Sequence, residues 1–287
     1  LCVRQAASAE FSLPEEQIIC GNGSDDLLTI AVRTLVDQGQ PLAYCVPSYS
    51  LYPVLADLQG ATHKPVNLDN DFRIPEDAAE QARGARLLLL ARPNAPTGTS
   101  TARDRLEKLC QDFQGVVWID EAYADFADDN CLDFVSRYPN VVVSRTFSKS
   151  YSLAGLRLGL AFAAPELILE MNKVKDSYNV DAITQCLGSA ALRASAYMRE
   201  NAARIRETRA WLAEQLRQLG CMVLPSQANF LFVRTPLDAE KVFADLRQGG
   251  FLVRYFKLPR ISEYLRITIG QREDMQAFID CLKKILS

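Results

Sequence analysis

Short apolar runs that alternate with amphipathic segments constrain the fold of this 287-residue chain more than any other feature. The strand-like run 86–91 is continuously apolar from Leu87 on, which is typical of a strand buried on both faces of a sheet. Segments with helical periodicity, such as residues 25–36 and 101–111, separate it from other short apolar runs. This rhythm predicts an α/β fold with a mostly parallel sheet sandwiched by helices.

The pattern changes in the last third of the chain, where long helical segments rich in Ala, Arg, Glu and Leu begin. Residues 166–175 and 182–219 are the predicted helices, and short strands and two further helices follow them. We therefore expect a smaller C-terminal α/β domain whose boundary lies inside the long helix. Residues 1–195 then form a large domain and residues 196–287 a small one.

Composition and charge exclude several classes of protein. Hydrophobic residues make up 48% of the chain, enough for a sizeable core. The net charge of −3 provides no basic surface for nucleic acid or for an anionic membrane. The longest apolar stretch, residues 87–91, is too short to cross a bilayer. We expect neither nucleic acid nor membrane as a partner.

The cysteines and the single histidine narrow the chemistry further. None of the eight cysteines forms a Cys-x-x-Cys pair, so no metal site is expected, and free cysteines indicate a reducing, cytoplasmic location. A Ser-His-Asp triad would have to use His63, the only histidine, which lies in what resembles a surface turn. Hydrolases of that type are therefore disfavoured.

Lys149 lies in the most informative run of the sequence, residues 144–159. It follows a strand-like Val-Val-Val segment, has hydroxyl side chains on both sides, and precedes Arg157 by eight residues. A lysine that forms an imine needs a carbonyl partner, and hydroxyls with one arginine suit a phosphate beside it. Imine and phosphate together indicate pyridoxal 5'-phosphate (PLP). The run alone is equally compatible with a solvated lysine in a serine-rich loop.

Three other motifs lie at the ends of predicted strands. Residues 21–26 read Gly-Asn-Gly-Ser-Asp-Asp between a strand and a helix, where free N–H groups suit a phosphate, although Ser24 or Asp25 could simply cap the helix. Asp120 ends an apolar strand, at the usual ligand crevice of an α/β sheet. It could pair with a pyridinium nitrogen or serve as an ordinary helix cap. The rigid turn 92–98 follows another strand.

Two arginines in strand-like segments of the C-terminal part indicate anion binding. Arg266 lies inside the apolar run 264–269, and a buried arginine is costly unless it meets an anion. It therefore reads as a carboxylate-binding residue. Arg254 could bind a second anion. The alternative, an arginine on an edge strand that points to solvent, is stronger for Arg254 than for Arg266.

These motifs, in this order, resemble those of the PLP-dependent aminotransferases of fold type I (class I/II), and within them the histidinol-phosphate aminotransferase group. The resemblance runs from about Gln17 to the end of the chain. It rests on Gly-Asn-Gly-Ser-Asp, Pro-Asn-x-Pro-Thr-Gly, Asp-Glu-Ala-Tyr, Thr-Phe-Ser-Lys-x-Tyr-x-Leu-Ala-Gly-Leu-Arg and Leu-Arg-Ile-Thr-Ile-Gly. The resemblance implies a PLP-binding large domain and a homodimer.

The resemblance also implies roles for individual residues. Lys149 would bind the cofactor as a Schiff base and later move the substrate proton. The implied cofactor-binding set is Asp120 at the pyridine nitrogen, Tyr123 at the ring 3′-oxygen, Tyr49 stacked on the ring, and Ser24, Asp25, Thr146, Ser148 and Arg157 at the phosphate. Arg266 would bind the substrate α-carboxylate, and Arg254 would be placed for a substrate phosphate.

The sequence departs from the family pattern in two places. The family commonly has Asn directly before Pro-Thr-Gly, where this chain has Ala95; either Asn94 substitutes for it through a shifted turn or Tyr123 acts alone. Family members also carry an N-terminal arm before the helix in which this chain begins. We expect a chain without that arm to retain its cofactor less well.

The resemblance favours transfer of an amino group from L-histidinol phosphate to 2-oxoglutarate, a step of histidine biosynthesis. The partners would then be a small amino acid or amino-phosphate and a 2-oxo acid. A lyase resembling threonine-phosphate decarboxylase, an aromatic amino acid aminotransferase and an inactive arm-less homologue are the alternatives.

Overall fold

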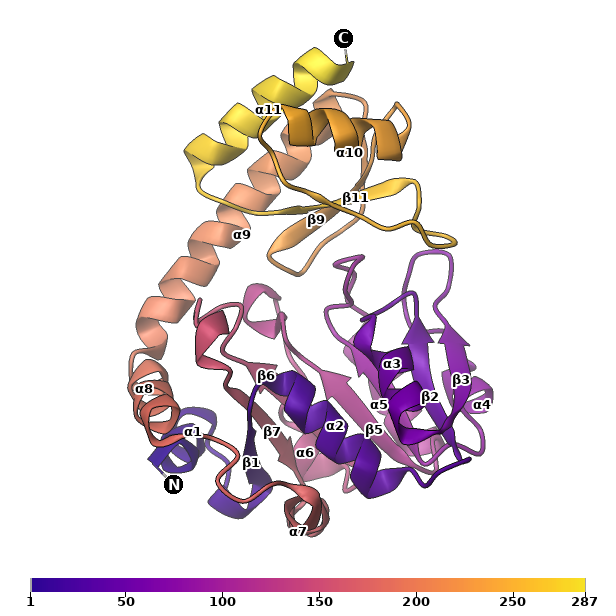
Figure 1. Ribbon diagram of the computed structural model, residues 1–287, viewed down its shortest axis with the longest axis vertical. Helices are drawn as coiled ribbons and strands as arrows, with labels where there is room; N and C mark the ends of the chain where they lie inside the picture. Colours follow the sequence, from indigo (N-terminus) through magenta and orange to yellow (C-terminus); the bar gives the residue numbers. More distant parts are fainter. Residues whose placement is uncertain (1, 287) are drawn as a thin grey trace.

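Parallel strands form the centre of the main sheet in the computed structural model, which describes residues 2–286 (Figure 1). The order is β1-β7-β6-β5-β4-β2-β3; the strands from β6 to β3 are parallel, and β7 is antiparallel to both of its neighbours. The strands are β1 (Ile18–Gly21), β2 (Pro41–Val46), β3 (Thr62–Asn67), β4 (Leu87–Ala91), β5 (Val116–Asp120), β6 (Val141–Thr146) and β7 (Gly159–Ala163). The mostly parallel sheet predicted from the sequence is confirmed.

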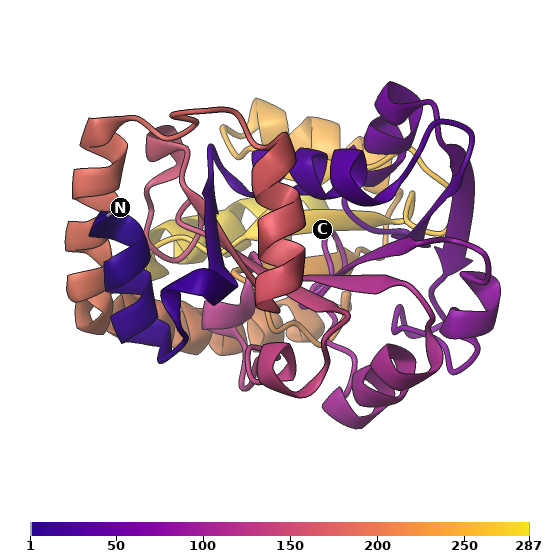
Figure 2. The same ribbon diagram turned by 90° about the horizontal axis from the view of Figure 1, so that it is seen from below.

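Helices cover both faces of this sheet (Figures 1 and 2). One face carries α2 (Ser24–Leu35), α3 (Leu51–Gln59) and α7 (Pro165–Val174). The other carries α1 (Cys2–Phe11), α4 (Ala78–Gln81), α5 (Arg103–Asp112), α6 (Phe134–Arg137) and α8 (Ala182–Arg193). No helix in residues 2–286 is long and apolar enough to cross a membrane.

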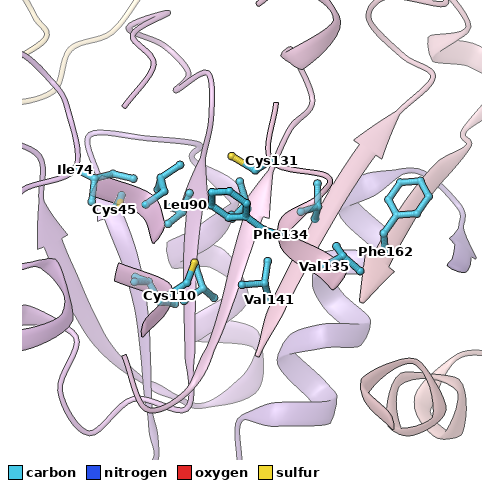
Figure 3. Close-up of a cluster of buried hydrophobic side chains, with 14 of the residues drawn as sticks. Cys45, Ile74, Leu90, Cys110, Cys131, Phe134, Val135, Val141 and Phe162 are labelled. Atoms are coloured by element: carbon cyan, nitrogen blue, oxygen red, sulfur yellow. The ribbon is translucent and has the colours of Figure 1, made fainter. Parts of the chain in front are cut away.

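The side chains of β4 explain its continuous apolar sequence. Leu87 and Leu89 pack against α2 and α3 in one core cluster, whereas Leu88 and Leu90 pack in the cluster on the opposite face. Figure 3 shows part of that second cluster, where Leu90 lies among Cys110, Phe134 and other buried side chains. Both faces of the strand are therefore dry, and neither has room for a polar residue.

The C-terminal part forms a second, antiparallel sheet of order β10-β11-β9-β8, at the top of Figure 1. Its strands are β8 (Met222–Val223), β9 (Phe230–Arg234), β10 (Arg254–Tyr255) and β11 (Tyr264–Thr268). Its helices are α9 (Ser195–Gln218), α10 (Ala239–Gln248) and α11 (Arg272–Leu286), which share one apolar cluster with the sheet. The expected smaller α/β unit is therefore present.

The prediction of a single helix over residues 182–219 is wrong. Ala194, with φ −97° and ψ 21°, leaves the helical conformation and separates α8 from α9. No glycine or proline marks this break. Tertiary contacts fix it instead, because α8 packs along α1 and the buried hydroxyl of Ser195 donates to Glu10 at 2.8 Å. The predicted domain boundary at residue 195 falls at this break and stays a prediction.

We expect Gly159→Ala to lower the free energy of unfolding by about 1–3 kcal/mol, because overpacking against rigid backbone is destabilising. A Cβ at Gly159 would lie 2.6 Å from backbone atoms of Gly23 and Ser24. Urea denaturation measures the change. Gly155→Ala is the matched control, because no described atom lies within 4 Å of a Cβ there. Equal stability losses in the two variants would contradict this account.

Candidate active site

The ends of β5 and β6 bring Asp120 into a buried polar group. Asp120 pairs with Ser144 across the two parallel strands and is only 5% exposed. Its Oδ1 accepts hydrogen bonds from the Ser144 hydroxyl and the Ala122 N–H, both at 3.2 Å, while Oδ2 accepts only a long one, 3.4 Å, from Tyr52. One carboxylate oxygen is therefore weakly bound and suited to a further donor.

Burial dominates the electrostatics of this carboxyl. It raises the pKa of Asp120 to about 6, although the hydrogen bonds from Ala122, Ser144 and Tyr52 act in the opposite direction. A nearby cation would offset the cost of ionising a buried acid. A protonated pyridine nitrogen is such a cation, and it also supplies the donor that Oδ2 lacks.

Lys149 follows β6 in an exposed loop beside this group. Its Nζ lies 5.5 Å from the centre of the Tyr123 ring, which in turn packs edge-on against Phe230 of β9. Two residues of the loop, Ser152 and Arg157, adopt left-handed backbone conformations with φ of 55° and 52°. Such conformations are strained for residues other than glycine and recur at functional sites.

Asp25, at the start of α2, contacts two other residues expected at the cofactor. Its carboxylate accepts a hydrogen bond from the Tyr49 hydroxyl at 3.1 Å and lies 3.5 Å from a guanidinium nitrogen of Arg157. Gly23 is needed here, because it has φ +87° and a Cβ would lie 2.6 Å from Arg157. The start of α2, the Tyr49 ring and the Arg157 guanidinium are therefore adjacent.

The first turn of α2 has its N–H groups available for an anion. Its N-cap residue is Gly23, and no side chain within the described residues caps the helix, so neither Ser24 nor Asp25 takes the capping role. Thr146 and Ser148 are linked to each other, since the Ser148 N–H donates to the Thr146 hydroxyl at 3.2 Å. These positions suit a phosphate and fit the sequence interpretation.

Asn94 is used inside its own turn. Its Oδ1 accepts from the Ser48 hydroxyl at 2.6 Å, and its amide nitrogen donates to the Pro47 carbonyl and the Thr97 hydroxyl at 3.1 and 2.9 Å. An amide has two N–H groups, so none is left for a cofactor ring. The geometry thus favours the second alternative, in which the bond is missing and Tyr123 acts alone.

A cavity of about 630 Å³ opens between the two sheets and carries both candidate anion-binding arginines. Its walls include Tyr49 and Ala95 from the large sheet side and Arg254, Phe256 and Arg266 from the small one. Both guanidinium groups lie near the Phe256 ring, at 5.4 and 5.7 Å from its centre.

Arg266 and Arg254 are direct cross-strand partners in β11 and β10. Like charges opposite each other destabilise a sheet. The Nε of Arg266 is also buried without a hydrogen-bond partner in residues 2–286, and an unmade bond of this kind is costly. An anion between the two guanidinium groups would remove both penalties.

Sequence reasoning missed the residues that support Asp120. Tyr52, Trp118 and Ser144 are not among the predicted site residues, yet Tyr52 and Ser144 donate to Asp120, and the Trp118 indole N–H donates to the Ser144 hydroxyl at 3.0 Å. The sequence offers one signal for Ser144, the alternation of side chains along a strand: Ser144 lies on the same face of β6 that Asp120 occupies on β5.

The family model described as aminotransferase class I and II matches residues 4–282. The chain belongs to this family. Histidinol-phosphate aminotransferases are among its relatives: that of Microcystis aeruginosa is 43% identical over 99% of this chain and 81% of its own length, and that of Synechocystis sp. is 46% identical over 93% and 76%.

Solved aminotransferase structures share the fold. The histidinol-phosphate aminotransferase of Sinorhizobium meliloti, in complex with pyridoxal-5'-phosphate, has a TM-score of 0.92 and 25% identity over 99% of this chain and 80% of its own. That of Clostridium acetobutylicum has the same TM-score at 18% identity, over 99% and 88%. The predicted resemblance to these aminotransferases and the predicted fold class are both confirmed.

We expect Asp120→Asn to change how stability depends on pH in this aminotransferase without added cofactor. The folded protein keeps the Asp120 proton up to about pH 6, whereas the unfolded chain releases it near about pH 4. Stability of the wild type relative to the variant should therefore fall by about 2 kcal/mol from pH 4 to 6 and stay constant above. Denaturant titrations across this range measure it, and parallel curves for the two proteins would contradict it.

Proposed function

We propose that the protein is a PLP-dependent aminotransferase that transfers the amino group of L-histidinol phosphate to 2-oxoglutarate. The observation that carries the cofactor assignment is the buried Asp120 carboxylate, which has one weakly bound oxygen and lies three residues before Tyr123, whose ring centre is 5.5 Å from the Lys149 Nζ. The relatives and the PLP complex described above support the substrate and the cofactor.

The bound cofactor supplies an electron sink for the carbanion that forms when the substrate Cα loses its proton. Lys149 would hold the cofactor covalently, and its amine, once released, would act as the general base and acid that moves the substrate Cα proton. Asp120 would pair with the pyridine nitrogen, and Tyr123 would donate to the ring 3′-oxygen. These roles are the ones proposed from the sequence.

The residues at the start of α2 and Arg157 would hold the cofactor phosphate. The uncapped first turn of α2, with Ser24 and Asp25, provides N–H donors, and Arg157 provides a guanidinium beside it. Ser148 and Thr146 add hydroxyl donors. The Tyr49 ring, held by its hydrogen bond to Asp25, is positioned to cover the cofactor ring.

The two cavity arginines suit both substrates. Histidinol phosphate carries a phosphate and no carboxylate, whereas 2-oxoglutarate carries two carboxylates, so each substrate presents an oxyanion that a guanidinium group can bind. We propose that Arg266 binds the α-carboxylate of the oxo acid and that Arg254 adds the second contact that a phosphate needs. Guanidinium groups bind both oxyanions through paired N–H donors.

We also propose that the protein is a cytoplasmic homodimer. All eight cysteines lie within the described residues and are free thiols, which suits a reducing compartment. Large apolar side chains are exposed on α8 and at the start of α9, with Ile183 71%, Leu187 50% and Tyr197 69% exposed. Exposed apolar groups of this kind mark interfaces, and a second copy is the proposed partner.

We expect Lys149→Ala to remove the absorbance band of the lysine-bound cofactor and to lower turnover by about 100- to 10,000-fold, because the general base is lost. Spectrophotometry with added PLP and a coupled assay measure the two effects. In the wild type, mixing with histidinol phosphate should convert the band to that of pyridoxamine phosphate. Release of CO₂ from a phosphorylated amino acid without this conversion would favour the decarboxylase-like lyase instead.

We expect Arg254→Ala to raise the KM for histidinol phosphate by about tenfold or more, because a charge-assisted contact to the phosphate is lost. The KM for unphosphorylated histidinol should change little. Arg234→Ala is the matched control, since Arg234 lies on β9 of the same sheet and pairs with Glu263 at the surface. If the KM values for histidinol phosphate and for histidinol rise equally, Arg254 does not contact the phosphate. That result would favour an aromatic amino acid as substrate.

A further inference from the structure

A buried ion-pair network lies behind the candidate site. Arg145 of β6 donates from Nε to Glu121 at 2.9 Å and from Nη1 to Asp125 at 2.8 Å. The Ser150 hydroxyl donates to the other oxygen of Asp125, and the Cys131 N–H donates to the other oxygen of Glu121 at 2.5 Å. We call Arg145, Glu121, Asp125 and Ser150 the Arg145 cluster.

Every carboxylate oxygen of the Arg145 cluster has a donor, and the cluster is largely dry. The side chains of Glu121, Arg145 and Asp125 are 0%, 10% and 22% exposed. Burial alone would lower the pKa of Arg145, yet the Glu121 and Asp125 carboxylates raise it, so the guanidinium stays charged. A fully satisfied buried network of this kind fixes the positions of its members.

The cluster lies on the sheet face opposite Asp120. Asp120 and Ser144 pair across β5 and β6 and face α2 and α3, and the next residue of each strand, Glu121 and Arg145, points the other way because side chains alternate. The Glu121 N–H also donates to the Ser144 carbonyl at 3.0 Å, which continues the ladder past the end of β5.

Three of the residues proposed to act on the cofactor ring are close chain neighbours of cluster members. Asp120 directly precedes Glu121, Tyr123 lies two residues before Asp125, and Lys149 directly precedes Ser150. Lys149 itself lies in an exposed loop that contains two strained residues, Ser152 and Arg157, so the cluster is what fixes the start of this loop. The cluster therefore ties the segment after β5, which carries Asp120 and Tyr123, to the segment after β6, which carries Lys149.

We propose that the Arg145 cluster is a positioning device that sets the distance and orientation of Lys149 relative to Asp120 and Tyr123. The inference rests on the proposed function, because it takes those three residues as the ones that contact the cofactor. Arginine suits the role because its planar fork reaches two carboxylates in fixed directions, which a lysine ammonium does not. Ser150 then transmits the position of Asp125 to the Lys149 backbone.

The test compares Asp125→Asn with Asp129→Asn in the full chain. Asp129 is a matched control, because it lies in the same connection after β5 as Asp125 and its carboxylate also pairs, at 2.7 Å, with a buried arginine, Arg92. Only Asp125 also accepts the Ser150 hydroxyl. For each variant, titration with PLP gives the dissociation constant, and the pH titration of the lysine-bound absorbance band gives its midpoint. Urea unfolding without PLP reports on folding.

We expect Asp125→Asn to weaken PLP binding by about tenfold or more and to shift the midpoint of the band, because misplaced reacting groups lose much of their mutual effect. Asp129→Asn should keep the wild-type dissociation constant and midpoint. Ser150→Ala, which keeps the ion pairs and removes only the link to the Lys149 loop, should shift the midpoint in the same direction with a loss of about threefold in PLP affinity.

Three outcomes decide the inference. Asp125→Asn and Ser150→Ala proteins that unfold like the wild type but show the expected shifts support it. If both variants keep the wild-type affinity and midpoint, the cluster is only structural and the inference is wrong, while the proposed function stands. A wild-type protein that shows no lysine-bound band would refute the placement of Lys149, and with it both proposals.

Discussion

The burial of the Asp120 carboxyl at the end of β5 is the constraint on which the rest of the site depends. The parallel strands are apolar on both faces, so the acid is removed from water and its pKa rises to about 6. The protein provides it with modest donors from Ser144, Tyr52 and Ala122. Asp120 has no strong cationic partner among the described residues. The site is therefore suited to a ligand that brings a cationic hydrogen-bond donor to this carboxylate.

On the other face of the sheet, the ends of β5 and β6 carry a buried acid that does have a cationic partner. There Glu121 and Arg145 are buried as an ion pair whose oxygens are all satisfied. Asp120, whose carboxylate has one weakly bound oxygen, and Glu121, whose carboxylate oxygens both accept hydrogen bonds, are therefore adjacent in the chain and lie on opposite faces of the sheet. Alternation of side chains lets a rigid support and a reactive group share the same few residues of backbone.

The sequence predicted the sheet, the alternation of helices and the principal site motifs, because these depend on local patterns. Continuous apolar runs predicted β4 and β6, and strand ends located Asp120 and Lys149. It could not predict the break at Ala194, which packing of α8 on α1 and the Ser195 to Glu10 bond impose. Nor could it predict which groups accept the two N–H bonds of the Asn94 amide, because Pro47 and Thr97 come within hydrogen-bonding distance only in the folded protein.

The distribution of the candidate residues over two sheets has a mechanical consequence. Lys149 and Asp120 belong to the large sheet, whereas Arg254 and Arg266 belong to the small one, and the 24-residue helix α9 runs between them (Figure 1). In the proposed reaction, a substrate bound by the arginines and acted on by Lys149 contacts residues of both sheets at once. Each catalytic cycle then makes and breaks a link between the two sheets, so substrate binding depends on how α9 holds one sheet relative to the other.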